Sequence, residues 1–98
     1  MYELDPRYKQ MILDAMNYHF PNARIILFGS RARGNNKESS DIDIAIDTGQ
    51  RIRLSAVGRA RTTLEHLPLP VGIDLVDFRS IPQELRDEIN RDGNVWKN

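Results

Sequence analysis

Residues 28–47 read FGSRARGNNKESSDIDIAID, and the prediction of the fold starts from this stretch. Residues 23–28 form a short apolar run rich in isoleucine, which is typical of a mostly buried strand. Residues 41–46 place isoleucine at every second position, which predicts another strand. Residues 33–40 are polar and contain Gly34 followed by two asparagines, so we expect a short helical turn and then a mobile loop.

Helical patterns and one more apolar run surround this stretch. Residues 5–20 begin with an aspartate followed by proline, a typical helix start, and carry apolar side chains at helical spacing. Residues 52–67 and 80–91 are also expected to be helices, the second of them ending just before a glycine. Residues 71–78 supply a third strand. This order predicts an α/β (α+β) fold in which helices flank a small β-sheet.

Length and composition limit the classes of protein to be considered. The chain has 98 residues, with 40% apolar and 29% charged residues, so we expect one globular domain over residues 1–98. Lys plus Arg and Asp plus Glu both total 14, and the resulting formal net charge of zero argues against a nucleic-acid substrate. The absence of cysteine, of a long apolar run and of a signal peptide indicates a cytoplasmic protein outside the membrane.

Asp41 and Asp43 are the first indication of a metal-binding site. Residues two apart on a strand project from the same face, which leaves Ile42, Ile44 and Ile46 to face the core. Neighbouring carboxylates repel each other and raise the pKa of one partner unless a cation lies between them. Mg²⁺ prefers such oxygen ligands and typically takes one or two carboxylates besides water and substrate phosphate. The pair therefore predicts a magnesium site.

Asp74 offers a third carboxylate. It lies in the middle of the third predicted strand, between Ile73 and Leu75, and can face the other two acids if the strands are neighbours. Three acids on adjoining strands can hold two metal ions, which stabilise the attacking and leaving oxygens of a phosphoryl displacement. The acid least shielded by a cation is placed to accept the proton of the attacking hydroxyl, and we assign that role to Asp74.

Gly29 and Ser30 stand where a strand ends and a helical turn begins, a geometry whose free N–H groups favour phosphate. Gly29 allows the backbone to approach a nucleotide closely, and the Ser30 hydroxyl adds one donor. Arg31, Arg33 and Lys37 supply positive charge nearby, and of these Arg33 is the candidate nucleotide-binding residue.

Simpler interpretations exist for several of these residues. Asp41 and Asp43 alone are also consistent with the polar face of an edge strand. Asp47 precedes Thr48 and Gly49, so a turn is as consistent with its position as a catalytic role, and Asp77 points away from Asp74 as a surface or turn residue. A solvated helix face is the simpler interpretation of Arg51, Arg53, Arg59 and Arg61.

The order GS, ten intervening residues, then DID resembles the signature of the DNA polymerase β-like nucleotidyltransferase superfamily. More narrowly, GSRARG followed by SDIDIAID is similar to the minimal nucleotidyltransferase family found as antitoxins beside HEPN-domain toxins. The resemblance implies a sheet of mixed direction and nucleotide-phosphate contacts at Gly29 and Ser30. It also implies a metal-binding catalytic triad of Asp41, Asp43 and Asp74.

Family members of this type transfer AMP from ATP to a tyrosine of the HEPN partner and silence its RNase activity. The resemblance therefore implies Mg²⁺, ATP and a hetero-oligomer with a HEPN-domain toxin, in a type VII toxin–antitoxin system. The alternatives are a non-catalytic antitoxin that masks the toxin surface, or nucleotidyl transfer to a small molecule or RNA. The complete set of acids favours an enzyme, and the alternative acceptors usually require an added domain. The nucleotide base, the acceptor residue and the oligomeric state do not follow from the sequence.

Overall fold

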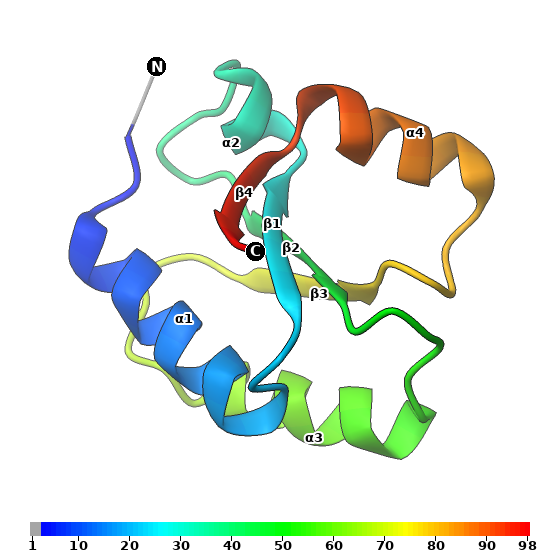
Figure 1. Cartoon of the computed structure of the whole chain (residues 1–98). Helices are drawn as coiled ribbons and strands as arrows, with labels where there is room; N and C mark the ends of the chain where they lie inside the picture. Colours follow the sequence, from blue (N-terminus) through cyan, green and yellow to red (C-terminus); the bar gives the residue numbers. More distant parts are fainter. Residues whose placement is uncertain (1–2) are drawn as a thin grey trace.

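The computed structural model describes residues 3–98, whose arrangement is shown in Figure 1. The helices are α1 (Pro6–His19), α2 (Ser30–Arg33), α3 (Leu54–Glu65) and α4 (Gln83–Asp92). The strands are β1 (Arg24–Phe28), β2 (Ile42–Asp47), β3 (Ile73–Asp77) and β4 (Asn94–Lys97). Every predicted element is present, and β4 is an addition. No helix within the described residues is both long and apolar enough to cross a membrane.

The strand β4 was not predicted, because so short a stretch cannot show a clear period of two. It pairs antiparallel with β1, with Val95 opposite Ile26 and Asn94 opposite Leu27. The predicted end of the preceding helix is correct, since Gly93 is its C-cap. Pairing with β1 therefore decides the conformation of this segment.

The strand order of the sheet is β3-β2-β1-β4. β2 pairs antiparallel with β1 and parallel with β3, so the sheet is of mixed direction, as the family resemblance implies. A parallel pair needs a crossover connection, and α3 lies in the connection between β2 and β3. As a result, β2 and β3 begin at the end of the sheet where β1 ends.

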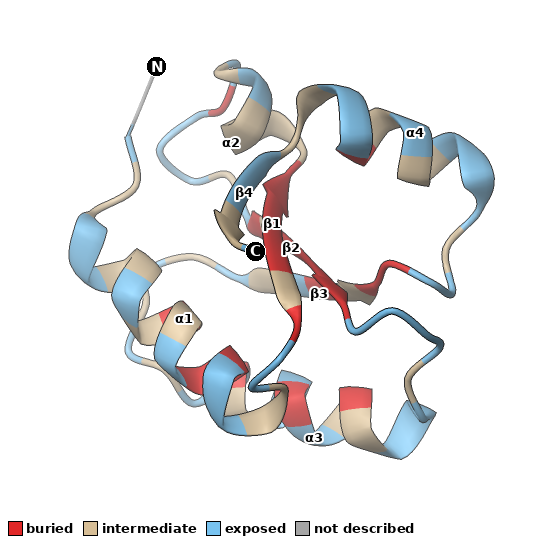
Figure 2. Cartoon of the chain, viewed as in Figure 1, coloured by how far each residue is buried: buried red, intermediate tan, exposed pale blue. Residues whose placement is uncertain are grey.

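Helices cover both faces of this sheet (Figures 1 and 2). On one face, α1 and α3 pack against Ile42, Ile44 and Ile46, which are at most 1% exposed, as predicted. On the other face, α4 packs through Ile89 against a smaller apolar cluster. Because side chains alternate along a strand, Asp43 points to the α4 face.

The loop after α2, which was predicted to be mobile, is held by several hydrogen bonds. Arg31 donates to the carbonyls of Ser40, at 3.0 and 3.1 Å, and of Glu38, at 3.1 Å. The Lys37 N–H donates to the Ser40 hydroxyl at 2.8 Å, and Asn36 is buried. The loop therefore leads to β2 along a defined path.

Candidate active site

The pairing of β2 with β3 brings the predicted metal-binding acids to one end of the sheet. Asp43 and Asp74 are Cα partners in the parallel register. At the start of this pairing the Ile42 N–H donates to the Gly72 carbonyl at 2.9 Å, and Asp41 comes directly before β2. The strands that carry the acids are therefore neighbours, as the prediction for Asp74 required.

Asp74 itself differs from its prediction in one respect. The sequence placed it in the middle of an apolar strand, where a charge is expected to be buried, but Asp74 is the second residue of β3 and is exposed. The reason is that β3 is an edge strand and that its packing under α4 begins only at Val76. The Asp74 carboxylate is accordingly open to solvent.

The side chains of Asp41 and Asp43 lie against two different glycines. A Cβ built on Gly72 would be 3.0 Å from Asp41 Oδ1, and one built on Gly29 would overlap Asp43 Oδ2. As they stand, no three His, Asp or Glu side chains within residues 3–98 form a group that could hold a metal ion. The register thus aligns the backbones of the acids, while their mutually repelling carboxylates are not gathered at one point.

The pKa of Asp43 reflects this repulsion. Burial raises the pKa of Asp43, the carboxylates of Asp74 and Asp41 raise it further, Arg33 lowers it and Glu88 raises it. The sequence predicts this conflict for acids on neighbouring strands, and a divalent cation relieves it. Since Mg²⁺ is bound by carboxylate oxygens, the chemistry of these donors fits a magnesium site.

Gly29 connects β1 to α2 in a conformation that other residues rarely adopt. Its φ is 76°, and the side chain of any other residue would meet Asp43. The Gly29 carbonyl accepts hydrogen bonds from the N–H groups of Ala32 and Arg33, both at 3.1 Å. The N–H groups at the start of such a turn have no partner within it and are available to an anion. A turn of the kind that binds phosphate, beginning with Ser30, therefore lies directly beside Asp43.

The cations near this turn differ in their partners. Arg31 is bonded to loop carbonyls, and Lys37 is exposed. Arg33 Nη1 lies 3.4 Å from Glu88 Oε2, and both of these charges act on the pKa of Asp43. The geometry therefore favours Arg33 among the three predicted cations. Glu88 was missed by the sequence interpretation, because nothing in its spacing separates it from the other charged residues of α4.

Asp47 lies at the opposite end of β2 and has structural partners. It is 5% exposed and accepts hydrogen bonds from the Gly49 N–H at 2.8 Å and from Arg79 Nε at 2.8 Å. Arg24 Nη1 is 3.6 Å from its other carboxylate oxygen. Of the two interpretations of Asp47, the turn is therefore the one that the structure confirms.

Asp77 was predicted to be a surface or turn residue, and it is a turn residue that is buried, at 7% exposed. Its Oδ2 accepts hydrogen bonds from the Ile52 N–H at 2.8 Å and from the Ser80 hydroxyl at 2.7 Å. These bonds join the segment before α3 to the turn after β3. They explain why a carboxylate is tolerated in the interior.

Asp47→Asn is expected to lower the free energy of unfolding by about 2 kcal/mol without changing the affinity for Mg²⁺-ATP. The loss should be smaller than the 3 to 5 kcal/mol typical of fully buried pairs, because the Arg79 side chain is 42% exposed. Urea unfolding and calorimetric titration of the same samples measure the two effects. A stable variant that no longer binds nucleotide would instead place Asp47 in the active site.

The pH dependence of this loss has a defined sign. Burial opposes ionisation of Asp47, but hydrogen bonds from Arg79 and Gly49 and the charges of Arg79 and Arg24 lower its pKa below the ordinary 3.8. Its contribution to stability is therefore complete above that value and is lost as the pH falls through the lowered pKa. The difference between wild type and Asp47→Asn should shrink accordingly in acid.

Comparison with known proteins identifies relatives of this chain. The model of the family "Polymerase beta, Nucleotidyltransferase" matches residues 11–97. "Probable protein adenylyltransferase MntA" of Haemophilus influenzae is 30% identical over 71 residues, and the match spans 72% of this chain but only 62% of that protein. A Methanocaldococcus jannaschii relative, whose name also contains the words "protein adenylyltransferase", is 38% identical over 66 residues, spanning 67% of this chain and 70% of the relative.

Solved structures share the fold. A chain in a crystal structure of a toxin–antitoxin with AMP-PNP has a TM-score of 0.78 and 28% identity, with 92% of this chain and 73% of that chain covered. A structure of tri-AMPylated Shewanella oneidensis HEPN toxin in complex with MNT antitoxin gives 0.76 and 25%, with coverages of 97% and 74%. Since the family match includes the glycine–serine turn and all three acids, this chain belongs to the polymerase β nucleotidyltransferase family.

Proposed function

We propose that this chain is an adenylyltransferase that moves AMP from Mg²⁺-bound ATP to a tyrosine of a HEPN-domain RNase toxin and thereby acts as its antitoxin, in a hetero-oligomer. The observation that carries the proposal is the register of Asp43 with Asp74 beside the turn at Gly29. Similarity to proteins named protein adenylyltransferases, and to the complex of an AMPylated HEPN toxin with an MNT antitoxin, supports the acceptor.

The three acids would bind two metal ions between them. Asp41 and Asp43 would hold one Mg²⁺ ion, and Asp43 and Asp74 would hold a second. When bound, the ions stabilise charge on the attacking and leaving oxygens of an in-line displacement. Because the carboxylates of these acids repel one another, bound cations would be needed for them to turn toward a common point.

The transfer step follows from the remaining groups. The acceptor hydroxyl oxygen forms a bond to the α-phosphorus of ATP. The bond from that phosphorus to the oxygen between the α- and β-phosphates breaks, and pyrophosphate leaves. The hydroxyl proton passes to Asp74, the exposed acid of β3. Ser30 and the N–H groups of its turn donate to phosphate oxygens, and Arg33 offsets their charge.

The test is transfer of label from ATP to the HEPN-domain partner. With wild type and Mg²⁺, label at the α-phosphate should appear on a tyrosine of the partner, whereas label at the γ-phosphate should not, because it leaves with pyrophosphate. EDTA should abolish the transfer. If the partner is never labelled and its RNase activity is nevertheless suppressed, the protein acts by masking and the proposed activity is wrong.

We also propose that residues 1–98 act as one domain and that the protein works in the cytoplasm, where ATP and Mg²⁺ are available. The two clusters of buried side chains lie on opposite faces of one sheet, which supports a single domain. The formal net charge of zero supports a protein acceptor over a nucleic acid.

Ser30→Ala is expected to weaken Mg²⁺-ATP binding by about fivefold, because it removes one hydroxyl donor and leaves the backbone N–H groups in place. Ser39→Ala is the matched control, since Ser39 is an exposed serine in the loop after α2. Calorimetric titration of both variants measures the difference. Equal affinities for the two variants would mean that Ser30 does not contact the triphosphate.

A further inference from the structure

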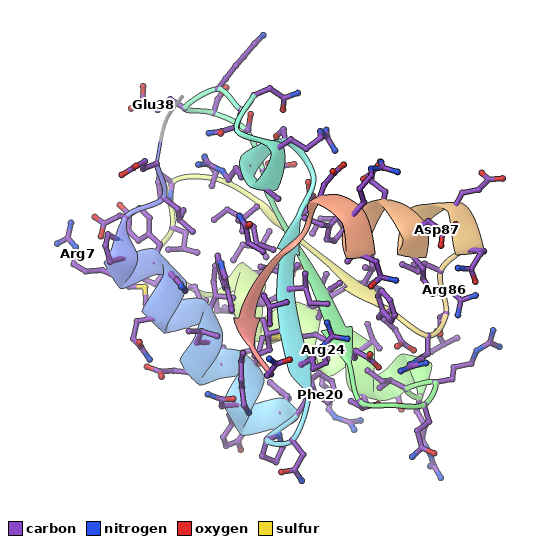
Figure 3. All side chains as sticks on the ribbon, turned by 45° about the horizontal axis from the view of Figure 1, so that its top comes forward. Arg7, Phe20, Arg24, Glu38, Arg86 and Asp87 are labelled. Atoms are coloured by element: carbon purple, nitrogen blue, oxygen red, sulfur yellow. The ribbon has the colours of Figure 1, made fainter. Side chains whose placement is uncertain are left out.

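The end of the sheet opposite the candidate active site is rich in arginine. The residues are Arg24, Arg51, Arg53, Arg61 and Arg79. Arg24 and Arg79 are paired with Asp47, whereas Arg51 and Arg53 are exposed and take part in none of the ion pairs found within residues 3–98. Figure 3 shows Arg24 far across the molecule from Glu38, which belongs to the loop that leads to the active site. These five arginines therefore outnumber the two carboxylates that lie among them, those of Asp47 and Asp77.

A hollow of about 150 Å³ lies at this end, between the start of α3, β3 and the segment before α4. Its apolar lining comes from Ile52, Leu54, Val57, Val76 and Ile81. Leu54 is 87% exposed. Arg61, Asp77 and Ser80 supply the polar part of its lining. The hollow therefore has room for one apolar or aromatic side chain of a partner.

The strand edge beside the hollow is closed by Arg61. This residue is exposed, as expected on a solvated helix face, and its Nε and Nη2 donate to the Leu75 carbonyl at 3.3 and 2.9 Å. β3 is an edge strand, and free carbonyls on such an edge invite pairing with another strand. Because Arg61 occupies this carbonyl, a partner should enter the hollow with a side chain and should not extend the sheet.

We propose that this distal surface, defined as the hollow with Leu54, Arg51, Arg53 and Arg61, docks an acidic segment of the protein acceptor whose one apolar side chain enters the hollow. The proposal rests on the proposed function, which makes the acceptor a protein. An apolar centre with a charged rim is the usual anatomy of a protein interface, and uncompensated arginines select an acidic partner.

The position of the distal surface suits a protein acceptor. It lies at the Asp77 end of β3, about 10 Å along the strand from Asp74 at 3.3 Å per residue. A bound acceptor can therefore leave the nucleotide site open while its tyrosine reaches Asp74. RNA fits less well, since phosphates would face the arginines but nothing in a nucleic-acid backbone would fill an apolar hollow.

The experiment is calorimetric binding of the HEPN-domain partner to the full chain. Arg51→Glu combined with Arg53→Glu should raise the Kd by at least about tenfold, and Leu54→Ala should raise it by about fivefold. Arg91→Glu and Tyr18→Ala are the matched controls, because their side chains are exposed on other helices, and both should bind like wild type. The KM for ATP should be unchanged in all four.

Several results would overturn the inference. One is that the variant with both Arg51→Glu and Arg53→Glu binds the partner with the same Kd as Arg91→Glu. Another is that an RNA oligonucleotide binds wild type but not the double variant, while the double variant still binds the partner. A third is self-association of wild type, seen by gel filtration, that Leu54→Ala abolishes, since the occupant would then be a second copy. Failure of the proposed function looks different: the partner would bind through the distal surface and remain unlabelled.

Discussion

Asp43→Asn is expected to abolish AMP transfer while the chain remains folded. The substitution keeps the size of the side chain but removes the charge that both proposed metal positions share, so kcat should fall by at least about 10³-fold. In Mg²⁺-free buffer the free energy of unfolding should stay equal or rise. The reason is that burial and the carboxylates of Asp74 and Asp41 already disfavour ionised Asp43 in the folded chain, as its raised pKa indicates. Labelled transfer and urea unfolding measure the two quantities.

The pH dependence gives a second signature of Asp43. A carboxyl group whose pKa is higher in the folded than in the unfolded state binds more protons when folded. Stability without Mg²⁺ should therefore decrease as the pH rises from the ordinary value of 3.8 through the raised pKa of Asp43. Asp43→Asn should remove this decrease. The sign is opposite to that expected for Asp47, whose pKa is lowered.

Asp14→Asn is the control for both measurements, because Asp14 is exposed on α1, which covers the face of the sheet opposite to the one that Asp43 points to. It should transfer AMP normally and show the pH dependence of wild type. Near-normal transfer by folded Asp43→Asn would show that the acids of β2 and β3 are not the catalytic centre. Loss of folding in Asp43→Asn would contradict the electrostatic account of this site.

Gly29→Ala is expected to lose Mg²⁺-ATP binding by at least about tenfold as well as stability. A φ of 76° with a ψ of −156° is essentially restricted to glycine and costs another residue about 1 to 3 kcal/mol. The added Cβ would also overlap the Asp43 carboxylate and displace it from the turn. Calorimetric titration and thermal unfolding measure these effects.

Gly49→Ala separates the two causes. Gly49 also has a positive φ, of 90°, but an added Cβ there meets nothing within 4 Å. Both alanine variants should lose stability through backbone strain, Gly29→Ala the more because of its overlap with Asp43, and only Gly29→Ala should lose nucleotide affinity. Equal ATP binding by the two variants would mean that the turn at Gly29 is not the phosphate site.

Local pattern was sufficient to predict the parts of this fold that depend on neighbours in sequence. Asp5 caps α1 through a bond of 2.8 Å from the Arg7 N–H, as expected from an aspartate before proline. β1 and β2 are consecutive strands joined by α2 and the loop after it, and their antiparallel pairing sets Phe28 opposite Asp43. This pairing places the GS turn beside the DID acids.

The sequence by itself determined the helices, three of the four strands and the identity of the candidate turn and acids, because periodicity and end signals are local properties. Only the tertiary structure decided that β3 lies beside β2, which aligns Asp74 with Asp43, and that α4 brings Glu88 to Arg33. The tertiary structure likewise decided that Asp77 is buried and that residues 94–97 form a strand. These features depend on which strands and helices become neighbours, and that choice is made by packing between segments far apart in the chain, which no local pattern records.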